Sequence, residues 1–397
     1  MAWPCLNHPL IIPKDDECFA AWRQNAAMDF SLNEDQVMIR DAAQSYLADH
    51  CGSEAVRAAI ASEAGYDPAV WQAIAAELGW CGVAIPEEFG GMGLGPVELM
   101  LIQEQVGYYL LPSPFFSTVC LVANILMHQG SAEAKSALLP LLAAGELRAT
   151  TVVPSEGEKY PEPTLRAIEV GGVWQVSGAV RVPDVGRDGL LLAFARTDEG
   201  PGLFQVPLDA AGIDHQPLQN WDASRRFVHL SLDNVAAQSR CDDAHAFRAG
   251  CPRSEALIRL YIAAEQLGAA QRCLDLTVTY VSERKQFGRV VGSFQAVKHR
   301  CAEMMVQVES LRSAVYGAAA LAAGDGRVSQ VAIECAMAKA MASEALCFCA
   351  GEAIQLHGGV GFTEEYDPQL FFKRAQASRH WMGTPQALRA EIAEVLL

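Results

Sequence analysis

The chain has 397 residues, of which 51% are hydrophobic and 19% are charged, and its formal net charge is −17. This length suggests two or three domains, and the composition is typical of a globular protein with a large core rather than of a disordered chain. An acidic surface repels phosphate backbones and anionic lipid heads, which argues against nucleic-acid or membrane-surface binding. The apolar runs are far shorter than the roughly 18 residues of a membrane span, so we expect no membrane insertion. The twelve cysteines include no CxxC pair, which favours reduced thiols, a cytoplasmic location and no metal site.

The first part of the chain is predicted to be a loose extension over residues 1–27 and a helical domain over residues 28–148. The extension lacks the basic and apolar regions of a secretory signal. Helical periodicity then runs through the domain, interrupted by a Gly- and Pro-rich loop at 86–96. After that loop, helices are predicted over 96–109, 114–128 and 132–144.

Two local signals mark where the early helices begin. Ser31 and Glu34 form an S-x-x-E capping box before an amphipathic run that continues to residue 50. Pro68 suits the first turn of the next helix, and Asp67 is its predicted cap.

The middle and the end of the chain differ in periodicity. Residues 149–250 contain short β-type runs, and Gly171 and Gly172 between two of these runs predict a hairpin, so we expect a small β-barrel domain. Residues 251–397 are helical again, with apolar residues spaced alternately by three and four, which is typical of the long helices of a four-helix bundle. The predicted fold is therefore an α+β multidomain protein. The apolar positions of one helix are Phe294, Val297, Cys301, Met304, Val308, Leu311 and Val315.

Two segments near helix ends carry residues that a plain bundle does not need. Arg284 and Gln286 precede Gly288, which we interpret as a helix stop. A second segment, QLHGGVGFT at 355–363, holds three glycines in four residues, and glycines let a backbone approach a ligand closely with free N–H groups. An arginine fork beside such a backbone suits a pyrophosphate. No GxGxxG motif follows a predicted strand, and no GxxxxGK[ST] motif occurs, so neither a Rossmann domain nor a P-loop is indicated.

In this order, the motifs resemble the acyl-CoA dehydrogenase family from Met28 onward. The most specific matches are AAEQLGAAQ, YVSERKQFGRVVGSFQAVKH, QLHGGVGFTEEY and GTPQALR. The resemblance implies an N-terminal helical domain, a middle β domain and a C-terminal bundle. It also implies that FAD binds between the last two domains and that a neighbouring subunit completes the site.

Carried over residue by residue, the resemblance assigns FAD contacts to three segments and a substrate-site role to Arg259. Arg284, Gln286, Phe294 and Gln295 form the first segment. Gln355, Gly358 and Gly359 form the second, which reaches the cofactor across a dimer interface, and Thr384 and Gln386 form the third. The middle-domain motif of the family, T-E-P ending in G-S-D, is absent, because residues 151–163 read TVVPSEGEKYPEP. The strand end at Val182 and Pro183 is the remaining part of that domain expected to face the flavin.

The sequence departs from the family pattern at the positions of the residue that removes the substrate proton. The family places a carboxylate either directly before the Gly-Thr matched by Gly383 and Thr384 or directly before the matched arginine. Here these places hold Met382 and Ile258, and neither side chain accepts a proton. Glu265 lies seven residues after Ile258, on nearly the same helix face, and is either a displaced base or a satisfied polar group in the helix packing. His380 is a further candidate. The backbone N–H of Met382 is expected to polarise the thioester carbonyl, as the equivalent N–H does in the family.

These observations predict an FAD-dependent enzyme of the acyl-CoA dehydrogenase type, or a subunit of one. The resemblance implies an acyl-CoA substrate, an electron-transfer flavoprotein as partner, and a homo- or hetero-oligomer that is a dimer or a tetramer. In one version the chain pairs with a base-bearing subunit, as steroid-degrading relatives do. In another it carries out flavin or thioester chemistry without a strong base. A non-catalytic structural subunit and an oxidase remain alternatives, and the acyl group is not specified.

Overall fold

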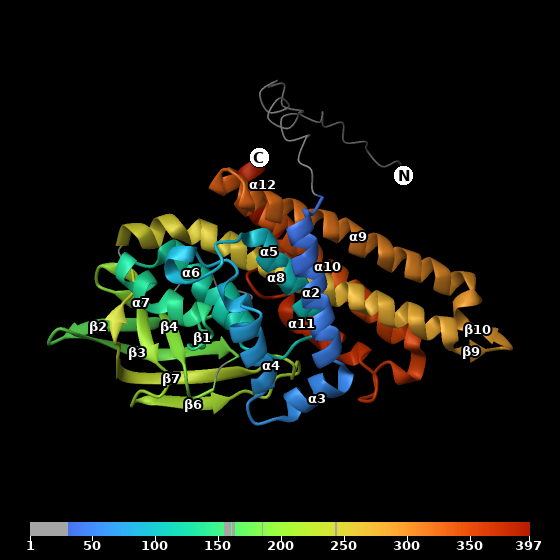
Figure 1. Ribbon diagram of the computed structural model, residues 1–397, viewed down its shortest axis with the longest axis horizontal. Coiled ribbons are helices and arrows are strands. Elements are labelled where there is room, and N and C mark those ends of the chain that lie inside the picture. The colour runs from blue at the N-terminus through green and yellow to red at the C-terminus, as the bar shows by residue number, and fades with distance from the viewer. Residues whose placement is uncertain (1–30, 155–159, 161–162, 185, 243) are drawn as a thin grey trace, which may run out of the picture.

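The computed structural model describes residues 31–154, 160, 163–184, 186–242 and 244–397. The proposed extension at 1–27 lies outside these residues. The sheet of the middle region lies at one end of the molecule, helices from the first part of the chain lie against it, and the long C-terminal helices extend to the other end (Figure 1). In the described residues no helix is long and apolar enough to cross a membrane.

The N-terminal region is helical, as the sequence predicts. Its helices are α2 (Glu34–His50), α3 (Ser53–Ala61), α4 (Pro68–Gln72), α5 (Pro96–Tyr108), α6 (Asn124–Gln129) and α7 (Ala132–Ala143), with π-helical turns at Ala73–Glu77 and Phe116–Ala123.

The caps of the first helices confirm one prediction and correct another. Asp67 caps α4, because its side chain accepts a hydrogen bond from the Ala69 N–H at 2.8 Å. The capping box of α2, in contrast, is formed by Asn33 and Gln36, whose side chains bond each other's backbone N–H groups. The Ser31–Glu34 prediction is therefore wrong by two residues, since asparagine serves as an N-cap as well as serine does and the box formed there instead.

The middle region is one eight-stranded sheet whose strands pair in the order β6-β7-β3-β2-β4-β5-β8, with β1 beside β4. The strands are β1 (Ala149–Thr150), β2 (Leu165–Val170), β3 (Val173–Pro183), β4 (Leu190–Thr197), β5 (Gly200–Pro207), β6 (Ile213–Pro217), β7 (Phe227–Ala236) and β8 (Ser239–Arg240). Gly171 and Gly172 form the β2–β3 turn with φ of 60° and 82°, which confirms the predicted hairpin.

The sheet is open, so the prediction of a barrel is wrong. Closure requires the two edge strands to pair, and among the described residues no ladder joins β6 to β8. One edge strand, β8, has only two residues, which leaves little backbone to pair with. Strand β4 is buried on both faces. Leu190, Leu192 and Phe194 pack against the helices, whereas the alternate residues join the core of the sheet. The helices therefore bury this face of the sheet, so the sheet does not have to close into a barrel to keep the face away from water.

The C-terminal region is a bundle built on three long helices, α8 (Ala244–Glu283), α9 (Gln295–Ala323) and α10 (Val328–His357). Two shorter helices, α11 (Pro368–Ser378) and α12 (Pro385–Leu396), pack against α10. Of the predicted apolar positions on α9, Met304, Val308, Leu311 and Val315 are fully buried. Helix α8 runs through the proposed domain boundary at 250/251, and the domain boundaries stay a prediction.

Gly288 does not end a helix. Helix α8 already ends at Glu283, and a two-stranded ribbon follows it, made of β9 (Lys285–Gln286) and β10 (Arg289–Val290). Phe287 and Gly288 form its turn with φ of 52° and 77°. A two-residue turn with both φ values positive favours glycine as strongly as a helix C-cap does, which is why the sequence signal was misassigned.

Helices α5 and α8 cross with their backbones almost in contact. A Cβ atom at Gly107 would lie 1.9 Å from the carbonyl oxygen of Glu265, and one at Gly268 would lie 1.8 Å from that of Glu104. Each helix therefore supplies a glycine where the other supplies a carbonyl. This crossing holds the Glu265 region of α8 against the N-terminal helices.

Candidate functional site

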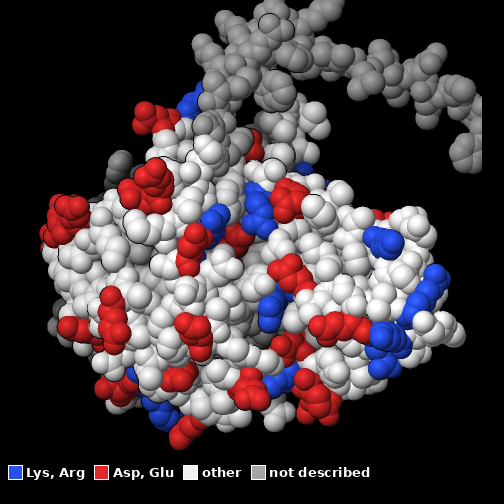
Figure 2. Space-filling model, turned by 45° about the vertical axis from the view of Figure 1, so that its right-hand side comes forward, with Lys and Arg blue, Asp and Glu red and all other residues white. Residues whose placement is uncertain are grey.

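A cleft of about 680 Å³ lies between the sheet and α11. Strands β3 and β7, the loop at 218–222, and residues 373–381 at the end of α11 and just after it all contribute to its lining. Trp221, Phe227 and Trp381 supply aromatic surface, and Arg181, Arg225 and Lys373 supply positive charge, against a single carboxylate, Asp222. This lining contrasts with a chain of net charge −17, whose acidic side chains are spread over the face shown in Figure 2. The cleft suits a ligand that is both aromatic and anionic.

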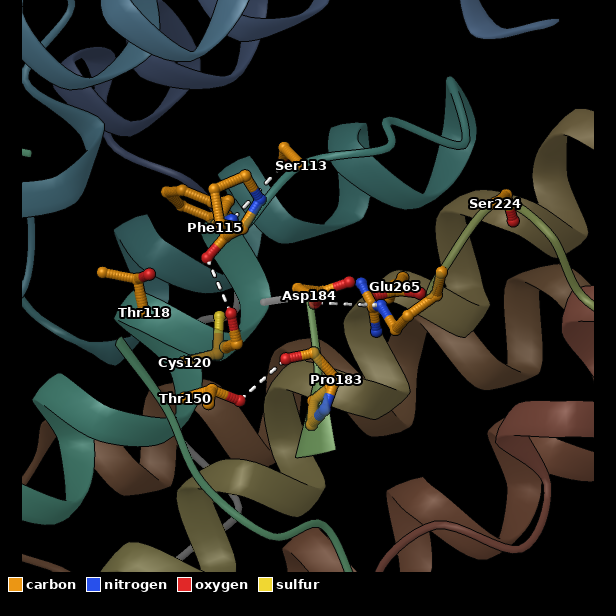
Figure 3. Close-up of polar contacts among 12 residues, drawn as sticks. Ser113, Phe115, Thr118, Cys120, Thr150, Pro183, Asp184, Ser224 and Glu265 are labelled. Atoms are coloured by element: carbon orange, nitrogen blue, oxygen red, sulfur yellow. Dashed lines mark hydrogen bonds and ion pairs between the residues drawn. The ribbon is translucent and has the colours of Figure 1, made fainter. Parts of the chain in front are cut away.

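Five charged side chains form a buried cluster at the cleft, and two of them, Asp222 and Arg225, belong to its lining. Arg374 of α11 donates from Nε to Asp222 at 2.6 Å and from Nη1 to Glu265, while Nη2 of Arg225 donates to the other oxygen of Glu265 at 3.1 Å. Asp184, which follows β3, contacts Nε of Arg225 at 3.4 Å (Figure 3). All five side chains are at least nine-tenths buried. Three carboxylates thus face two guanidinium groups and tie the sheet, α8 and α11 together.

Asp184 is the least well compensated member of this cluster. Burial raises the pKa of its carboxyl from 3.8 to about 6, even though the neighbouring Arg225 and Arg374 act to lower it. Oδ2 of Asp184 and Nη1 of Arg225 are buried and have no hydrogen-bond partner in the part of the chain that the structure describes. The guanidinium of Arg225 also contacts two rings that stack on each other, and it lies 4.3 Å from the Phe116 centroid and 5.2 Å from the Trp381 centroid.

Glu265 is fully engaged by its neighbours. Besides the two arginines, Gln103 Nε2 donates to it at 2.7 Å, and its side chain is 3% exposed. It does not line the cleft. Of the two interpretations left open by the sequence, this geometry favours the satisfied polar group over the displaced base. His380 does line the cleft.

The two positions expected to hold a base are apolar and buried. Ile258 and Met382 are 1% and 3% exposed, and neither lines the cleft. The backbone N–H of Met382 donates to the carbonyl of Pro154 at 2.7 Å. It is therefore already paired in this structure, contrary to the expectation that it polarises a thioester.

Arg259 is held by protein groups. It donates to both carboxylate oxygens of Glu391 at 2.8 and 2.9 Å, to Glu255 at 2.8 Å and to the Met382 carbonyl at 3.3 Å. It is buried and lies outside the cleft lining. A substrate contact by Arg259 stays a prediction.

The predicted cofactor residues lie away from the cleft of their own chain. Arg284 and Gln286 are exposed at the β9–β10 ribbon, at the end of the molecule farthest from the sheet (Figure 1). The ring of Tyr280 stacks on His357 at 4.3 Å, which joins the end of α8 to the end of α10 and brings the first two predicted segments together. The following residues are also outside the cleft lining: Phe294, Gln295, Gln355, Gly358, Gly359, Thr384 and Gln386.

Each of these segments has a defined local structure. Gly358 and Gly359 have open space where a Cβ would lie, and Gly358 has a φ of 65°. Gln355 and Gln286 are exposed, whereas Thr384 caps α12 through a 3.2 Å bond from the Ala387 N–H. Val182 and Pro183 are buried, and the neighbouring residues Ala179, Val180 and Arg181 line the cleft in their place. Residues 155–159, 161 and 162 of the altered loop lie outside the described residues.

Sequence reasoning missed most of the residues that line the cleft. Trp221, Asp222 and Arg225 lie in the connection between β6 and β7, and β6 itself was not predicted because its sequence, IDHQP, lacks an apolar pattern. Arg374 and Trp381 lie on and just after α11, where an arginine and a tryptophan are unremarkable without the packing around them. The one available signal was the close spacing of a Trp-Asp pair, Trp221 and Asp222, and an Arg-Arg pair, Arg225 and Arg226.

Comparisons with known proteins agree with this architecture. The acyl-CoA dehydrogenase IpdE2 of Mycolicibacterium smegmatis is 34% identical over 365 residues, which cover 92% of this chain and 100% of IpdE2. The solved Tcur3481–Tcur3483 steroid ACAD is 30% identical, with a TM-score of 0.82, over 92% of this chain and 98% of that chain. The ChsE4–ChsE5 complex from Mycobacterium tuberculosis is 26% identical, with a TM-score of 0.82, over 93% of this chain and 99% of that chain.

The family models match both helical regions. The N-terminal domain of acyl-CoA dehydrogenase matches residues 33–146, and its C-terminal domain matches residues 256–397. Acyl-CoA dehydrogenases of this fold bind FAD. The open sheet separates the two matched regions along the chain and forms one wall of the cleft. This chain belongs to the acyl-CoA dehydrogenase family.

Proposed function

We propose that the protein is an FAD-dependent subunit of an acyl-CoA dehydrogenase that acts on a bulky acyl-CoA thioester. The observation that supports this most directly is the cleft between the sheet and α11, where aromatic and cationic side chains gather in an otherwise acidic chain. Relatives named for steroid acyl-CoA dehydrogenases favour a bulky acyl group. Electrons would pass to an electron-transfer flavoprotein.

The residues of the cleft fit FAD chemically. The flavin ring is flat and aromatic, and Trp221, Phe227 and Trp381 offer apolar faces for it. The diphosphate is anionic, and Arg181 and Lys373 offer cations. When bound, FAD supplies the acceptor for the hydride that leaves the β-carbon of the acyl group.

The exposed segments fit the same cofactor in a neighbouring chain. Arg284 presents a guanidinium from the β9–β10 ribbon, and Gly358 and Gly359 leave their backbone open at the end of α10. Because these groups lie away from the cleft of their own chain, we propose that they hold the nucleotide end of FAD bound to the cleft of a partner. The protein would then act as an oligomer.

The visible spectrum of the purified protein tests cofactor binding. We expect a yellow protein with close to one FAD per cleft, and we expect Arg284→Ala to lose most of it. Arg300→Ala is a matched control, because Arg300 is an exposed arginine on α9 that pairs with Glu303 and Glu352. A colourless wild-type protein that does not take up added FAD would overturn the proposal.

A second proposal concerns catalysis: the chain has no base of its own and depends on a base-bearing partner subunit. It is supported by the apolar side chains of Met382 and Ile258, by the engaged carboxylate of Glu265 and by the paired N–H of Met382. Proton removal by a positioned base contributes about 10²–10⁴ in rate, so the isolated chain should desaturate acyl-CoA slowly at best.

Flavin bleaching by a panel of saturated acyl-CoAs tests this second proposal. With the isolated chain we expect little bleaching, and with subunits that co-purify from the native host we expect rapid bleaching. Rapid bleaching of the isolated chain would show that it has a base of its own. That result would contradict the proposed need for a partner subunit, but it would not contradict the proposal that the chain binds FAD.

A further inference from the structure

Lys339 on α10 belongs to a buried hydrogen-bond network that joins three helices. Its Nζ donates to Oγ of Ser343 at 2.6 Å and to the backbone carbonyl of Ser378 at 3.4 Å. Oγ of Ser343 donates to Oε1 of Gln266 at 3.3 Å, and Nε2 of Gln266 donates to the hydroxyl of Ser378 at 2.8 Å. All four residues are at most 1% exposed. The network therefore fixes the end of α11 from both α8 and α10.

The hydrogen bonds of this network fit a neutral amine. In the part of the chain that the structure describes, Nζ of Lys339 has two acceptors, the hydroxyl of Ser343 and the carbonyl of Ser378. A neutral amine donates two N–H groups and uses both acceptors, whereas the third N–H of an ammonium has none. An unpaired buried donor costs free energy, and a buried charge costs more.

The groups around Lys339 favour the same neutral form. Those that act on its charge are Arg259 on α8, Cys347 on α10 and Arg379, which directly follows α11. Helix α9 packs on α10 with its buried apolar residues, and α12 does so with Leu388. Burial, and after it Arg259, lowers the pKa of Lys339 from 10.5 to about 7. The amine is thus neutral at pH 8.5 and takes up a proton as the pH falls through 7.

The carbonyl of Ser378 connects the network to the cleft. Ser378 is the last residue of α11, and its carbonyl also accepts the N–H of Trp381 at 3.2 Å. This bond closes the turn that brings His380 and Trp381 into the cleft lining. The ring of Trp381 stacks on Phe116, with the centroids 6.1 Å apart. The aromatic wall of the cleft is therefore held by an atom that Lys339 contacts.

We propose that Lys339, as a neutral amine, is a positioning residue that holds the turn at 378–381 against the cleft, and that proton uptake by Lys339 loosens this turn. Opening the turn lets water reach Nζ, and water pairs the third N–H and solvates the charge, so protonation favours the open form. Lys339 itself does not line the cleft. The consequence for the cofactor rests on the proposed function: FAD binds more weakly below pH 7, because Trp381 is less well placed.

Hydrogen exchange of the full-length protein without added FAD measures the turn directly. The N–H of Trp381 is bonded within the turn, and that of Met382 is bonded to the carbonyl of Pro154 at 2.7 Å. We expect the protection factors of both amides to fall about tenfold from pH 8.5 to pH 6.5, since each pKa unit between the closed and open forms is a factor of ten. Val308, in the buried face of α9, should exchange more slowly at both pH values, which identifies a local opening.

The affinity for FAD is the second readout. Flavin fluorescence titrations of the cofactor-free full-length protein should give a Kd that is at least about threefold weaker at pH 6.5 than at pH 8.5. A role in stability alone would move the unfolding midpoint with pH but leave the Kd of the folded protein unchanged.

Two variants assign the pH dependence to Lys339. Lys339→Met takes up no proton, so its protection factors and Kd should change less than about twofold over this range, and Lys339→Arg keeps its charge, so its turn should be poorly protected at both pH values. Lys135→Met is the control, because Lys135 lies on α7 outside the cleft lining, and it should show the wild-type change.

The outcomes separate this inference from the proposed function. A yellow protein whose turn is equally protected at both pH values, or whose Lys339→Met variant keeps the wild-type change, overturns the role of Lys339 and leaves FAD binding intact. A colourless protein that takes up no FAD but whose turn opens on protonation overturns the flavoprotein and supports the positioning role. If Lys339→Arg does not fold, the wild-type profile and Lys339→Met still decide the question.

Discussion

Asp184 is a carboxyl group kept in an environment that favours its neutral form. Burial raises its pKa to about 6, and the two nearby arginines only partly offset this. Since the folded pKa lies above the unfolded one, the folded chain binds the extra proton between about pH 4 and pH 6. The contribution of Asp184 to the free energy of unfolding is therefore most favourable below pH 4 and is lost as the pH rises through 6. At neutral pH the protein carries this cost within the buried charged cluster.

Asp184→Asn should consequently stabilise the protein at neutral pH. We expect its free energy of unfolding at pH 7.5 to exceed that of the wild type by up to about 3 kcal/mol, because a pKa unit corresponds to about 1.4 kcal/mol. The gain should shrink as the pH falls toward 4. Urea unfolding at several pH values measures the difference, and an equal or lower stability of the variant at pH 7.5 would show that the ion pair with Arg225 outweighs burial.

Lys339 presents the opposite case within the bundle. It is fully buried, and its ammonium donates to Ser343 Oγ at 2.6 Å and to the Ser378 carbonyl at 3.4 Å, with no carboxylate partner among the described residues. Burial, together with the positive charge of Arg259, lowers its pKa from 10.5 to about 7. A lowered pKa means that the folded state binds fewer protons than the unfolded state between pH 7 and pH 10.5. The contribution of Lys339 to stability therefore improves as the pH rises over that range.

Lys339→Met removes this titration. The free energy of unfolding of the variant should exceed that of the wild type by the largest amount at pH 6. This difference should shrink by on the order of 3 kcal/mol by pH 10. Thermal or urea unfolding of both proteins across this range provides the measurement. A difference that does not change with pH would mean that the lysine stays charged in the fold, held by Ser343 and Ser378.

At the scale of the elements, the glycines at the α5–α8 crossing decide how closely two helices approach. Gly107 and Gly268 face backbone carbonyls, which cannot move aside as a flexible side chain could. The crossing also places Gln103 against Glu265. Local signals predicted the helices themselves, as the Asp67 cap and the runs at 96–109 and 132–144 show. The crossing could not be predicted, because a glycine within a helical pattern does not reveal which helix it faces.

Gly268→Ala should therefore destabilise the fold by about 2 kcal/mol or more, since the added methyl group forces the helices apart. Gly351→Ala is the matched control. Gly351 also lies within a long helix, α10, but has open space at its Cβ position, so alanine there should stabilise by about 0.5–1 kcal/mol. Urea unfolding of both variants tests the contrast, and similar effects at the two positions would contradict the role of the crossing.

At the scale of the whole molecule, one chain presents two incomplete halves of the proposed cofactor site. The cleft lies between the sheet and α11, and the exposed Arg284 and Gly358 lie toward the other end of the bundle (Figure 1). Exposed apolar residues accompany the second half, including Phe287, Met305 and Val306, which are 92%, 57% and 62% exposed. Both features are consistent with an oligomer in which each cleft is completed by another chain.

Complementation between two defective variants tests this arrangement. Ala377→Trp fills the cleft that Ala377 lines, and Arg284→Ala removes the exposed guanidinium. Each variant alone should lose FAD, whereas their co-expressed, doubly tagged complex should retain about one FAD per two chains, because one of its two sites is intact. FAD retained by Arg284→Ala alone would contradict a shared site. A colourless mixed complex would contradict a homo-oligomer.

The sequence by itself determined the local structure and the family. Helical and β periodicity, the Asp67 cap, the Gly171-Gly172 turn and the motifs from Met28 onward each depend on neighbouring residues, and neighbouring residues are what a sequence records. Tertiary structure alone decided that the sheet stays open, that Gly288 turns a ribbon, that Glu265 and the Met382 N–H are already engaged, and that five charged side chains gather in one buried cluster. Those outcomes depend on contacts between segments tens to hundreds of residues apart, where burial and charge compensation are set by packing that no local pattern encodes.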